Sequence, residues 1–201
     1  MYNRQLLDKC LDVDFEKILK SKGYSYFTNG IYNLNIIGVR SKDSKESVNV
    51  FNDALILIYT AEDGKHIEVF PITTDPGLYY LKNNLSIKGC AILKEAQVRG
   101  GWQIGLHQGK YKALVQKKPV TVYRDSNKDS KLDFVNEETG MFGINIHKSG
   151  ESSTQVDRWS AGCQVFARVK DFNKFMNLVQ KGNNKYGNSF TYTLINETDL
   201  K

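Results

Sequence analysis

Apolar side chains recur at intervals of three and four along residues 4–21, and charged side chains fill most positions between them. These intervals place side chains on one face of an α-helix, and Gly23 then favours the end of the helix. The pattern predicts an amphipathic N-terminal helix that packs on its own domain, with Cys10 as a thiol on the buried face. A helix that binds a partner through the same face is the alternative.

From residue 24 onward the pattern changes to the alternation of period two that is typical of β-strands. Asn29-Gly30 separates two alternating segments within residues 24–40, and Asp63-Gly64 separates two more within residues 54–74. Both dipeptides favour hairpin turns. We expect further strands near residues 90–93, 102–106, 119–123 and 142–147.

The last part of the chain predicts one more helix and one more strand. Between Asp171 and Gly182, four apolar residues fall at helical spacing, namely Phe172, Phe175, Met176 and Val179. The segment SFTYTLI, residues 189–195, then alternates as a strand. The fold class is therefore mostly β, of the α+β kind, with a helix near each end of the chain. We expect residues 1–45 to form a helix and a hairpin packed on a main domain of residues 46–201.

Composition narrows the class of protein. At 201 residues the chain suits one domain with a buried core. The net charge of +6 favours anionic partners, but basic residues are scattered among acidic ones and no nucleic-acid motif occurs, so we expect no nucleic acid as a partner. No apolar run reaches the ~18 residues of a transmembrane segment, and the charged N-terminus is unlike a signal peptide. Three widely spaced cysteines without a CxxC pair argue against a disulfide scaffold or a cysteine-rich zinc site.

One stretch combines the residue types of nucleophilic catalysis. In INIHKSGESSTQVDRWSAGCQVFA, residues 144–167, His147 ends a predicted strand and a polar loop leads to Cys163 on a Ser-Ala-Gly-Cys turn. Alternation turns Ile144 and Ile146 toward the core and His147 toward the more open face. Because the loop is long enough to fold back, His147 could serve as the base that deprotonates the Cys163 thiol.

The residues of this turn suit such chemistry. Small side chains let the backbone N–H groups of Gly162 and Cys163 point at the oxyanion of a tetrahedral intermediate, and Ser160 can hold the turn by a local hydrogen bond. A buried structural cysteine is the alternative, since free cysteine is among the most buried residue types. The His–Cys spacing does not decide between the two.

The order of strand, histidine, polar loop and Ser-x-Gly-Cys resembles the catalytic signature of the L,D-transpeptidases, which ends in Ser/Thr-His-Gly-Cys. A second segment, ITTDPGLYYL at residues 72–81, looks like the Thr-Pro-x-Gly-x-Tyr type of strand entry upstream of that family's catalytic histidine. The resemblance spans about residues 50–195. It implies an L,D-transpeptidase-like β-rich catalytic domain and a cysteine acyl-transfer enzyme that acts on peptidoglycan stem peptides.

By position, the resemblance assigns four residues to the catalytic site: Cys163 as nucleophile, His147 as base, and Ser160 and Gly162 as residues that shape the turn. In the family a backbone carbonyl helps to orient the histidine, and catalysis requires no cofactor. If a side chain helps as well, Asn145 and Asp157 are the candidates.

Two positions depart from the family pattern. Ala161 stands where the family has a second histidine, and Gln164-Val165 stands where it has an apolar residue followed by Arg or Asn. These changes leave the acyl acceptor open between water and an amine. WSAGCQVF also looks like divergent, phage-encoded members of the group. We therefore expect synthesis in the cytoplasm and action at the cell wall, with release at lysis or carriage on a virion.

Two rival functions stay open, and so does the oligomeric state. The first rival is a cysteine hydrolase of another amide or ester that uses the same residues. The second is a non-catalytic wall-binding or virion structural protein on the same fold.

Oxygen-bearing side chains recur at alternate positions in YRDSNKDSKLDF: Asp125, Asn127, Asp129 and Asp133 occupy positions 1, 3, 5 and 9 of a calcium-type loop. Lys131 would offer its carbonyl at position 7. Ser130 replaces the usual glycine at position 6, and Asn136 replaces the usual glutamate at position 12. The spacing predicts a structural Ca²⁺ site, with an acidic turn between strands as the alternative.

Three more side chains are candidates for contact with the substrate. Trp159 adjoins the Ser-Ala-Gly-Cys turn, Tyr79 lies in the upstream segment, and His107 ends a predicted strand before a turn. Each has a structural alternative, because a tryptophan can anchor a loop in the core and most single histidines are structural.

Overall fold

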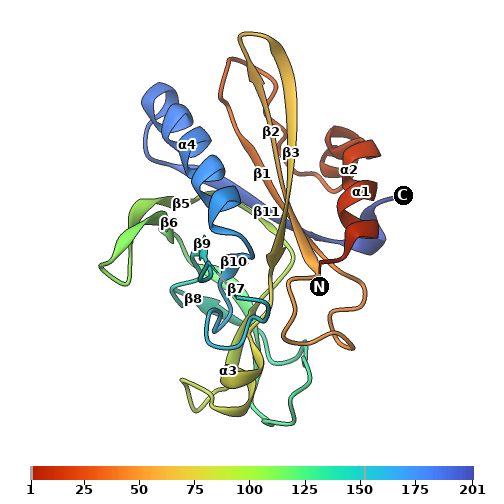
Figure 1. The fold of residues 1–201 in the computed structure, drawn as a ribbon, viewed down its shortest axis with the longest axis vertical. Helices are drawn as coiled ribbons and strands as arrows, with labels where there is room; N and C mark the ends of the chain where they lie inside the picture. Colours follow the sequence, from red (N-terminus) through yellow and green to blue (C-terminus); the bar gives the residue numbers. More distant parts are fainter. Residues whose placement is uncertain (1, 152) are drawn as a thin grey trace.

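The computed structural model describes residues 2–151 and 153–201 and is built around a closed eight-stranded barrel (Figure 1). Around the barrel the strands follow the order β1-β11-β5-β6-β9-β10-β3-β2. Their bounds are β1 Asn35–Arg40, β2 Asp53–Ala61, β3 Gly64–Thr73, β5 Gln97–His107, β6 Tyr111–Gln116, β9 Ile146–Lys148, β10 Gln164–Phe166 and β11 Phe190–Asn196. A separate three-stranded sheet holds β4 Cys90–Leu93, β7 Val120–Asp125 and β8 Glu138–Gly140. The prediction of a mostly β fold with few helices is confirmed.

The described residues also form four α-helices and one 3₁₀-helix: α1 Arg4–Asp12, α2 Phe15–Ser21, α3 Leu78–Lys82, α4 Val169–Tyr186 and η1 Glu197–Asp199. The single helix expected over residues 4–21 is instead two helices. Val13 takes an extended conformation that ends α1, and the Asp14 carboxylate accepts a hydrogen bond from the Lys17 N–H, which starts α2. Within the described residues no helix is long and apolar enough to cross a membrane.

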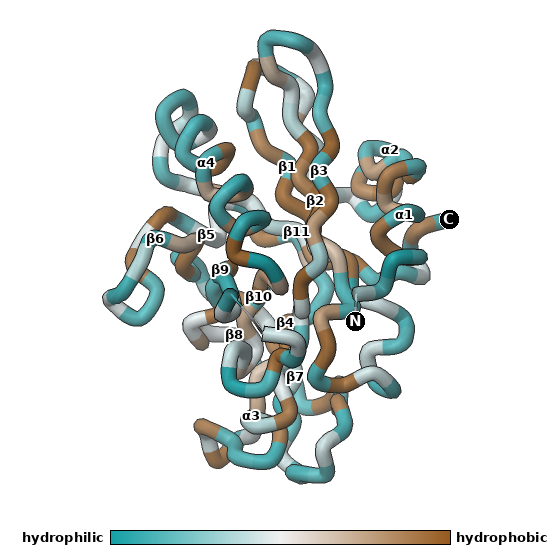
Figure 2. The backbone as a smooth tube through the Cα atoms, in the orientation of Figure 1, coloured by the Kyte–Doolittle hydropathy of each residue, from teal (hydrophilic) through white to brown (hydrophobic). Residues whose placement is uncertain are grey.

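The two N-terminal helices pack on the outside of the barrel. Cys10, Phe15 and Leu19 lie fully buried in a cluster with β-strand residues that include Ile37 and Ile56. Figure 2 shows hydrophobic residues along β1 and β2, whereas the tip of the β2–β3 hairpin is hydrophilic. The buried thiol predicted for Cys10 is confirmed.

The hairpin predicted around Asn29-Gly30 is wrong. β1 pairs with β2 and, in parallel, with β11, whereas residues 24–34 form no strand. The Asn35 side chain explains the difference, because it bonds both the N–H and the carbonyl of Phe27 at 2.8 Å. These backbone groups are then unavailable to a hairpin partner. The second hairpin, β2–β3 around Asp63-Gly64, forms as predicted.

The interior of the barrel is filled by large aromatic side chains and closed by α4. Trp102 and Tyr192 meet edge to face at 5.3 Å, and Phe166 contacts Phe172 and Phe175 of α4. The apolar stripe predicted for this helix is therefore its buried face. This packing fixes the short parallel strands β9 and β10, which carry the candidate catalytic residues.

Candidate active site

The structure brings Cys163 beside the segment that leads into His147. β9 and β10 are parallel neighbours, with Val165 opposite His147, so Cys163 enters β10 next to Asn145. Of the strand predicted at 142–147, only Ile146 and His147 lie in a regular strand, β9, and Gly143 has a left-handed φ of 71°. The Cys163 Sγ accepts a hydrogen bond from the Asn145 N–H at 3.4 Å and lies 3.4 Å from the Gly143 carbonyl, to which its S–H can donate.

The turn before Cys163 is held by Ser160. Its buried hydroxyl donates to the Cys163 carbonyl at 2.8 Å and accepts from the Gly162 N–H at 3.1 Å. Gly162 has a φ of 125°, and a methyl group there would collide with the Ala91 carbonyl oxygen, so both conformation and space require glycine. The Gly162 N–H is thus used inside the turn. Among the described residues no hydrogen bond is recorded for the Cys163 N–H, which leaves this group available to an oxyanion.

His147 is buried, with 3% of its surface exposed, and not on an open face as alternation predicted. The reason is that α4 and β6 close over this face of the short strand, through Phe172 and Tyr111. The His147 Nδ1 lies 2.9 Å from the Lys148 carbonyl oxygen. A carbonyl can only accept, so Nδ1 carries the proton and Nε2 is the basic nitrogen.

A second imidazole stacks on the first. The rings of His107 and His147 are 3.9 Å apart between centroids and inclined by only 19°. The amide of Asn145 connects His107 to the cysteine segment: its Oδ1 accepts from the Gln116 N–H at 3.0 Å, so its Nδ2 donates to His107 Nδ1 at 3.1 Å. Sequence reasoning placed His107 near the cleft but gave no sign of this stacking, which joins residues forty positions apart.

Burial keeps the resting groups neutral. Removal from water raises the pKa of the Cys163 thiol to about 11, and the bond from the Asn145 N–H only partly offsets this. Burial, assisted by the charge that His107 would carry, lowers the pKa of His147 to about 3. Burial also lowers the pKa of His107. The resting site therefore holds a thiol and neutral imidazoles, and no thiolate–imidazolium pair.

The upstream segment meets the cysteine turn in space. β3 pairs with β10, with Thr73 opposite Val165, and the Gly77 N–H donates to the Ser160 carbonyl at 2.9 Å. The buried amide of Gln164 accepts from the Tyr192 hydroxyl at 2.8 Å and reaches the Thr74 carbonyl at 3.4 Å. Gln164, a departure from the family pattern, is thus a structural link between the turn and the barrel interior.

Comparison of the chain with protein-family models, with curated proteins and with solved structures finds no match in any of the three.

Three other candidates lie on or against residues 157–159, the segment just before the cysteine turn. Trp159 is 43% exposed, and Tyr79 lies under the Arg158 guanidinium at 3.8 Å. Asp157 is exposed, and its N–H is held by Asn49. Within the described chain, the structure records no contact of the Asp157 side chain with His147. The Tyr111 hydroxyl, which the sequence did not indicate, lies 3.4 Å from the His147 Nδ1.

The predicted calcium loop is compact. Asp125 is buried and accepts from the Asp133 N–H at 3.1 Å, and Asn127 donates to the Asp133 carboxylate at 2.6 Å. Ser130 has a φ of 73°, the left-handed conformation that position 6 of such a loop requires. Across residues 2–151 and 153–201, no cluster of three or more His, Cys, Asp or Glu side chains is arranged to hold a metal ion. The Ca²⁺ site stays a prediction.

Proposed function

We propose that the protein is a cysteine acyl-transfer enzyme of the L,D-transpeptidase type that acts on peptidoglycan stem peptides. The observation that carries the proposal is the tautomer of His147. Its Nδ1 proton is committed to the Lys148 carbonyl at 2.9 Å, so Nε2 is the basic nitrogen, on the strand that neighbours the one that Cys163 enters. A backbone carbonyl that orients the histidine is also what the family resemblance implies.

The proposed reaction starts from neutral groups. Substrate binding excludes water, the proton of the Cys163 Sγ passes to Nε2 of His147, and the sulfur attacks a stem-peptide carbonyl carbon. The oxyanion of the tetrahedral intermediate accepts from the Cys163 N–H. When the intermediate collapses, the C–N bond breaks and the departing amine takes the proton from His147. Water or a second amine then attacks the thioester carbon and gives a proton to His147. As the C–S bond breaks, the Cys163 sulfur takes this proton from His147 and leaves as the thiol.

The stacked His107 favours this order of events. A positive charge on His147 is disfavoured by the neighbouring imidazole and by burial, so the proton taken from sulfur is readily passed on to the leaving amine. Ala161 supplies no side-chain donor at the position where the family has its second histidine. Both hydrolysis and cross-linking are therefore reactions to be tested.

Intact-mass measurement after exposure to a carbapenem or to purified muropeptides tests the proposal. We expect an acyl adduct on Cys163 in the wild-type protein and in Cys10→Ala, which removes a buried thiol elsewhere in the fold. We expect none in Cys163→Ser, and a strong loss of adduct in His147→Ala. A full yield of adduct in either site variant would refute the proposal. A changed muropeptide profile after incubation with whole peptidoglycan would distinguish wall chemistry from the hydrolysis of another amide or ester.

One competing function is a non-catalytic wall-binding protein on the same fold, in which Cys163 is a structural thiol held between the Asn145 N–H and the Gly143 carbonyl. This alternative predicts that the Cys163→Ala protein binds peptidoglycan as well as the wild type does, and that neither protein alters it. Pelleting with insoluble peptidoglycan, followed by muropeptide analysis, separates the two.

A further inference from the structure

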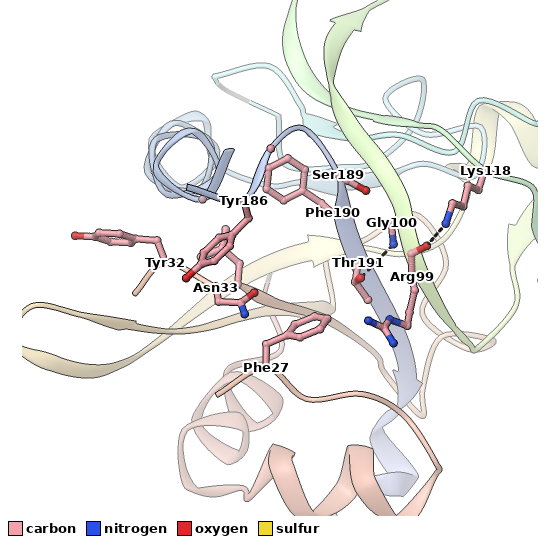
Figure 3. Close-up of a pocket in the computed structure, with 13 residues that line it drawn as sticks. Phe27, Tyr32, Asn33, Arg99, Gly100, Lys118, Tyr186, Ser189, Phe190 and Thr191 are labelled. Atoms are coloured by element: carbon pink, nitrogen blue, oxygen red, sulfur yellow. Dashed lines mark hydrogen bonds between the residues drawn. The ribbon is translucent and has the colours of Figure 1, made fainter. Parts of the chain in front are cut away.

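A cavity of about 420 Å³ opens at the end of β5 that is remote from His107 (Figure 3). It lies between the segment that precedes β1, the C-terminal end of α4, the start of β11 and residues 99–100 of β5. Phe27, Tyr186 and Phe190 give it aromatic walls, and Tyr32, whose ring is stacked on Tyr59, lies at its edge. None of the residues that line it belongs to the candidate active site, so the cavity is separate from that site.

Its aromatic walls are fixed before any ligand arrives. The Tyr186 hydroxyl donates to the Ile31 carbonyl at 3.0 Å, and Gly30 is the residue that leaves room for this hydroxyl, because a methyl group there would collide with it. The Tyr32 hydroxyl donates to the Glu62 carboxylate at 2.9 Å. Both rings are therefore held by bonds made outside the cavity. A ligand would therefore bind to a preformed surface, and little side-chain conformational entropy would be lost on binding.

The charge of the cavity is positive. Its thirteen lining residues include Arg99 and Lys118 but no carboxylate. The Lys118 ammonium donates to the Arg99 carbonyl at 2.7 Å, as Figure 3 shows, and so lies beside the same strand segment. The Arg99 guanidinium lies 5.9 Å from the centre of the Phe27 ring, and in the described part of the chain it makes no ion pair. A guanidinium in this setting can take a carboxylate in a two-point contact.

We propose that this cavity binds a saccharide that carries a carboxylate. A sugar ring presents C–H faces that pack on aromatic rings, and its hydroxyls need polar partners at the edge, which Asn33 and Ser189 supply. The carboxylate completes the match by pairing with Arg99. This ligand chemistry rests on the cavity alone.

Titration of the Cys163→Ala protein with single sugars tests the inference without any contribution from catalysis. The probes are N-acetylmuramic acid, glucuronic acid and neutral N-acetylglucosamine, each followed by the amide NMR signals of Gly100 and Gly187 up to about 20 mM, since one sugar ring binds in the millimolar range. We expect saturable shifts with N-acetylmuramic acid and clearly weaker ones with the neutral sugar. Saturable binding of both N-acetylmuramic acid and glucuronic acid supports the carboxylate-bearing class of saccharide.

Two variants locate the contact. Arg99→Gln should weaken binding of the acidic sugars about tenfold, and Phe27→Leu should weaken binding of every sugar that binds. Arg4→Gln, which removes an exposed arginine that does not line the cavity, should change neither. The inference is overturned if no acidic sugar saturates, if the neutral sugar binds as tightly, or if Arg99→Gln binds like the parent protein. Adduct formation on Cys163 is measured separately, so either proposal can fail alone.

Discussion

The reactivity of the Cys163 thiol should report directly on the neutral resting state of the site. Burial raises its pKa from 9.0 to about 11. At pH 7 the thiolate fraction is then about one in 10⁴, against about one in 10² for a thiol at the ordinary value. Alkylation by iodoacetamide, which requires the thiolate, should therefore be about a hundredfold slower than for a solvated cysteine at pH 7. Its rate should rise about tenfold per pH unit up to about pH 10.

Pseudo-first-order alkylation followed by peptide mass mapping gives this rate for each cysteine. Cys10 and Cys90 are internal references, because both are buried more fully and burial raises their pKa values to about 12. We expect Cys163 to react first. His147→Gln should leave its rate unchanged within about twofold at neutral pH, since a neutral imidazole that donates to Lys148 does not stabilise a thiolate.

A plateau of the alkylation rate between pH 6 and 8, lost in His147→Gln, would refute this reasoning. Such a plateau is the mark of a thiolate that is stabilised by an imidazolium, and the stacked, buried arrangement of His107 and His147 excludes one in the resting protein. The acyl-transfer proposal itself would survive, but its first step would then precede substrate binding.

Three further outcomes are expected. The pKa of His147 is lowered to about 3 in the folded protein, so below the ordinary value of 6.5 the unfolded chain binds a proton that the folded protein does not. The free energy of unfolding should therefore fall between pH 6.5 and 3, by at most about 1.4 kcal/mol per pH unit from this group. The urea midpoints at pH 7 and pH 5 should differ more in the wild type than in His147→Gln. Gly162→Ala should lower the free energy of unfolding by about 2–4 kcal/mol and abolish the adduct on Cys163. Gly143 also has a left-handed φ but has open space around it, so Gly143→Ala should lower the free energy of unfolding by only about 1 kcal/mol. Equal urea midpoints for the two variants would contradict the collision with the Ala91 carbonyl oxygen. Isothermal titration should show Ca²⁺ binding that Asp129→Asn weakens, and a flat titration at millimolar metal would end the calcium prediction.

Local patterns along the chain were sufficient for much of the secondary structure. Alternation located β2, β3 and β4, and the spacing of Phe172, Phe175 and Val179 located α4 with its buried face. These predictions succeed because each depends on side chains a few residues apart. The Ser-x-Gly-Cys turn is of the same kind, since Ser160, Gly162 and Cys163 bond to one another.

Contacts between distant segments decided what local patterns could not. The Asn35 side chain hydrogen-bonds the backbone N–H and carbonyl of Phe27, and these bonds replace the hairpin pairing that Asn29-Gly30 favours. His147 follows the alternation of its strand, yet α4 and β6 bury it, which turns an expected open-face imidazole into a neutral one. The stacking of His107 on His147, and the amide of Asn145 between His107 and the cysteine segment, exist because barrel closure sets β5, β6, β9 and β10 side by side. Residue types and their order along the chain indicated a thiol and a base, whereas their protonation states and neighbours are properties of the closed barrel.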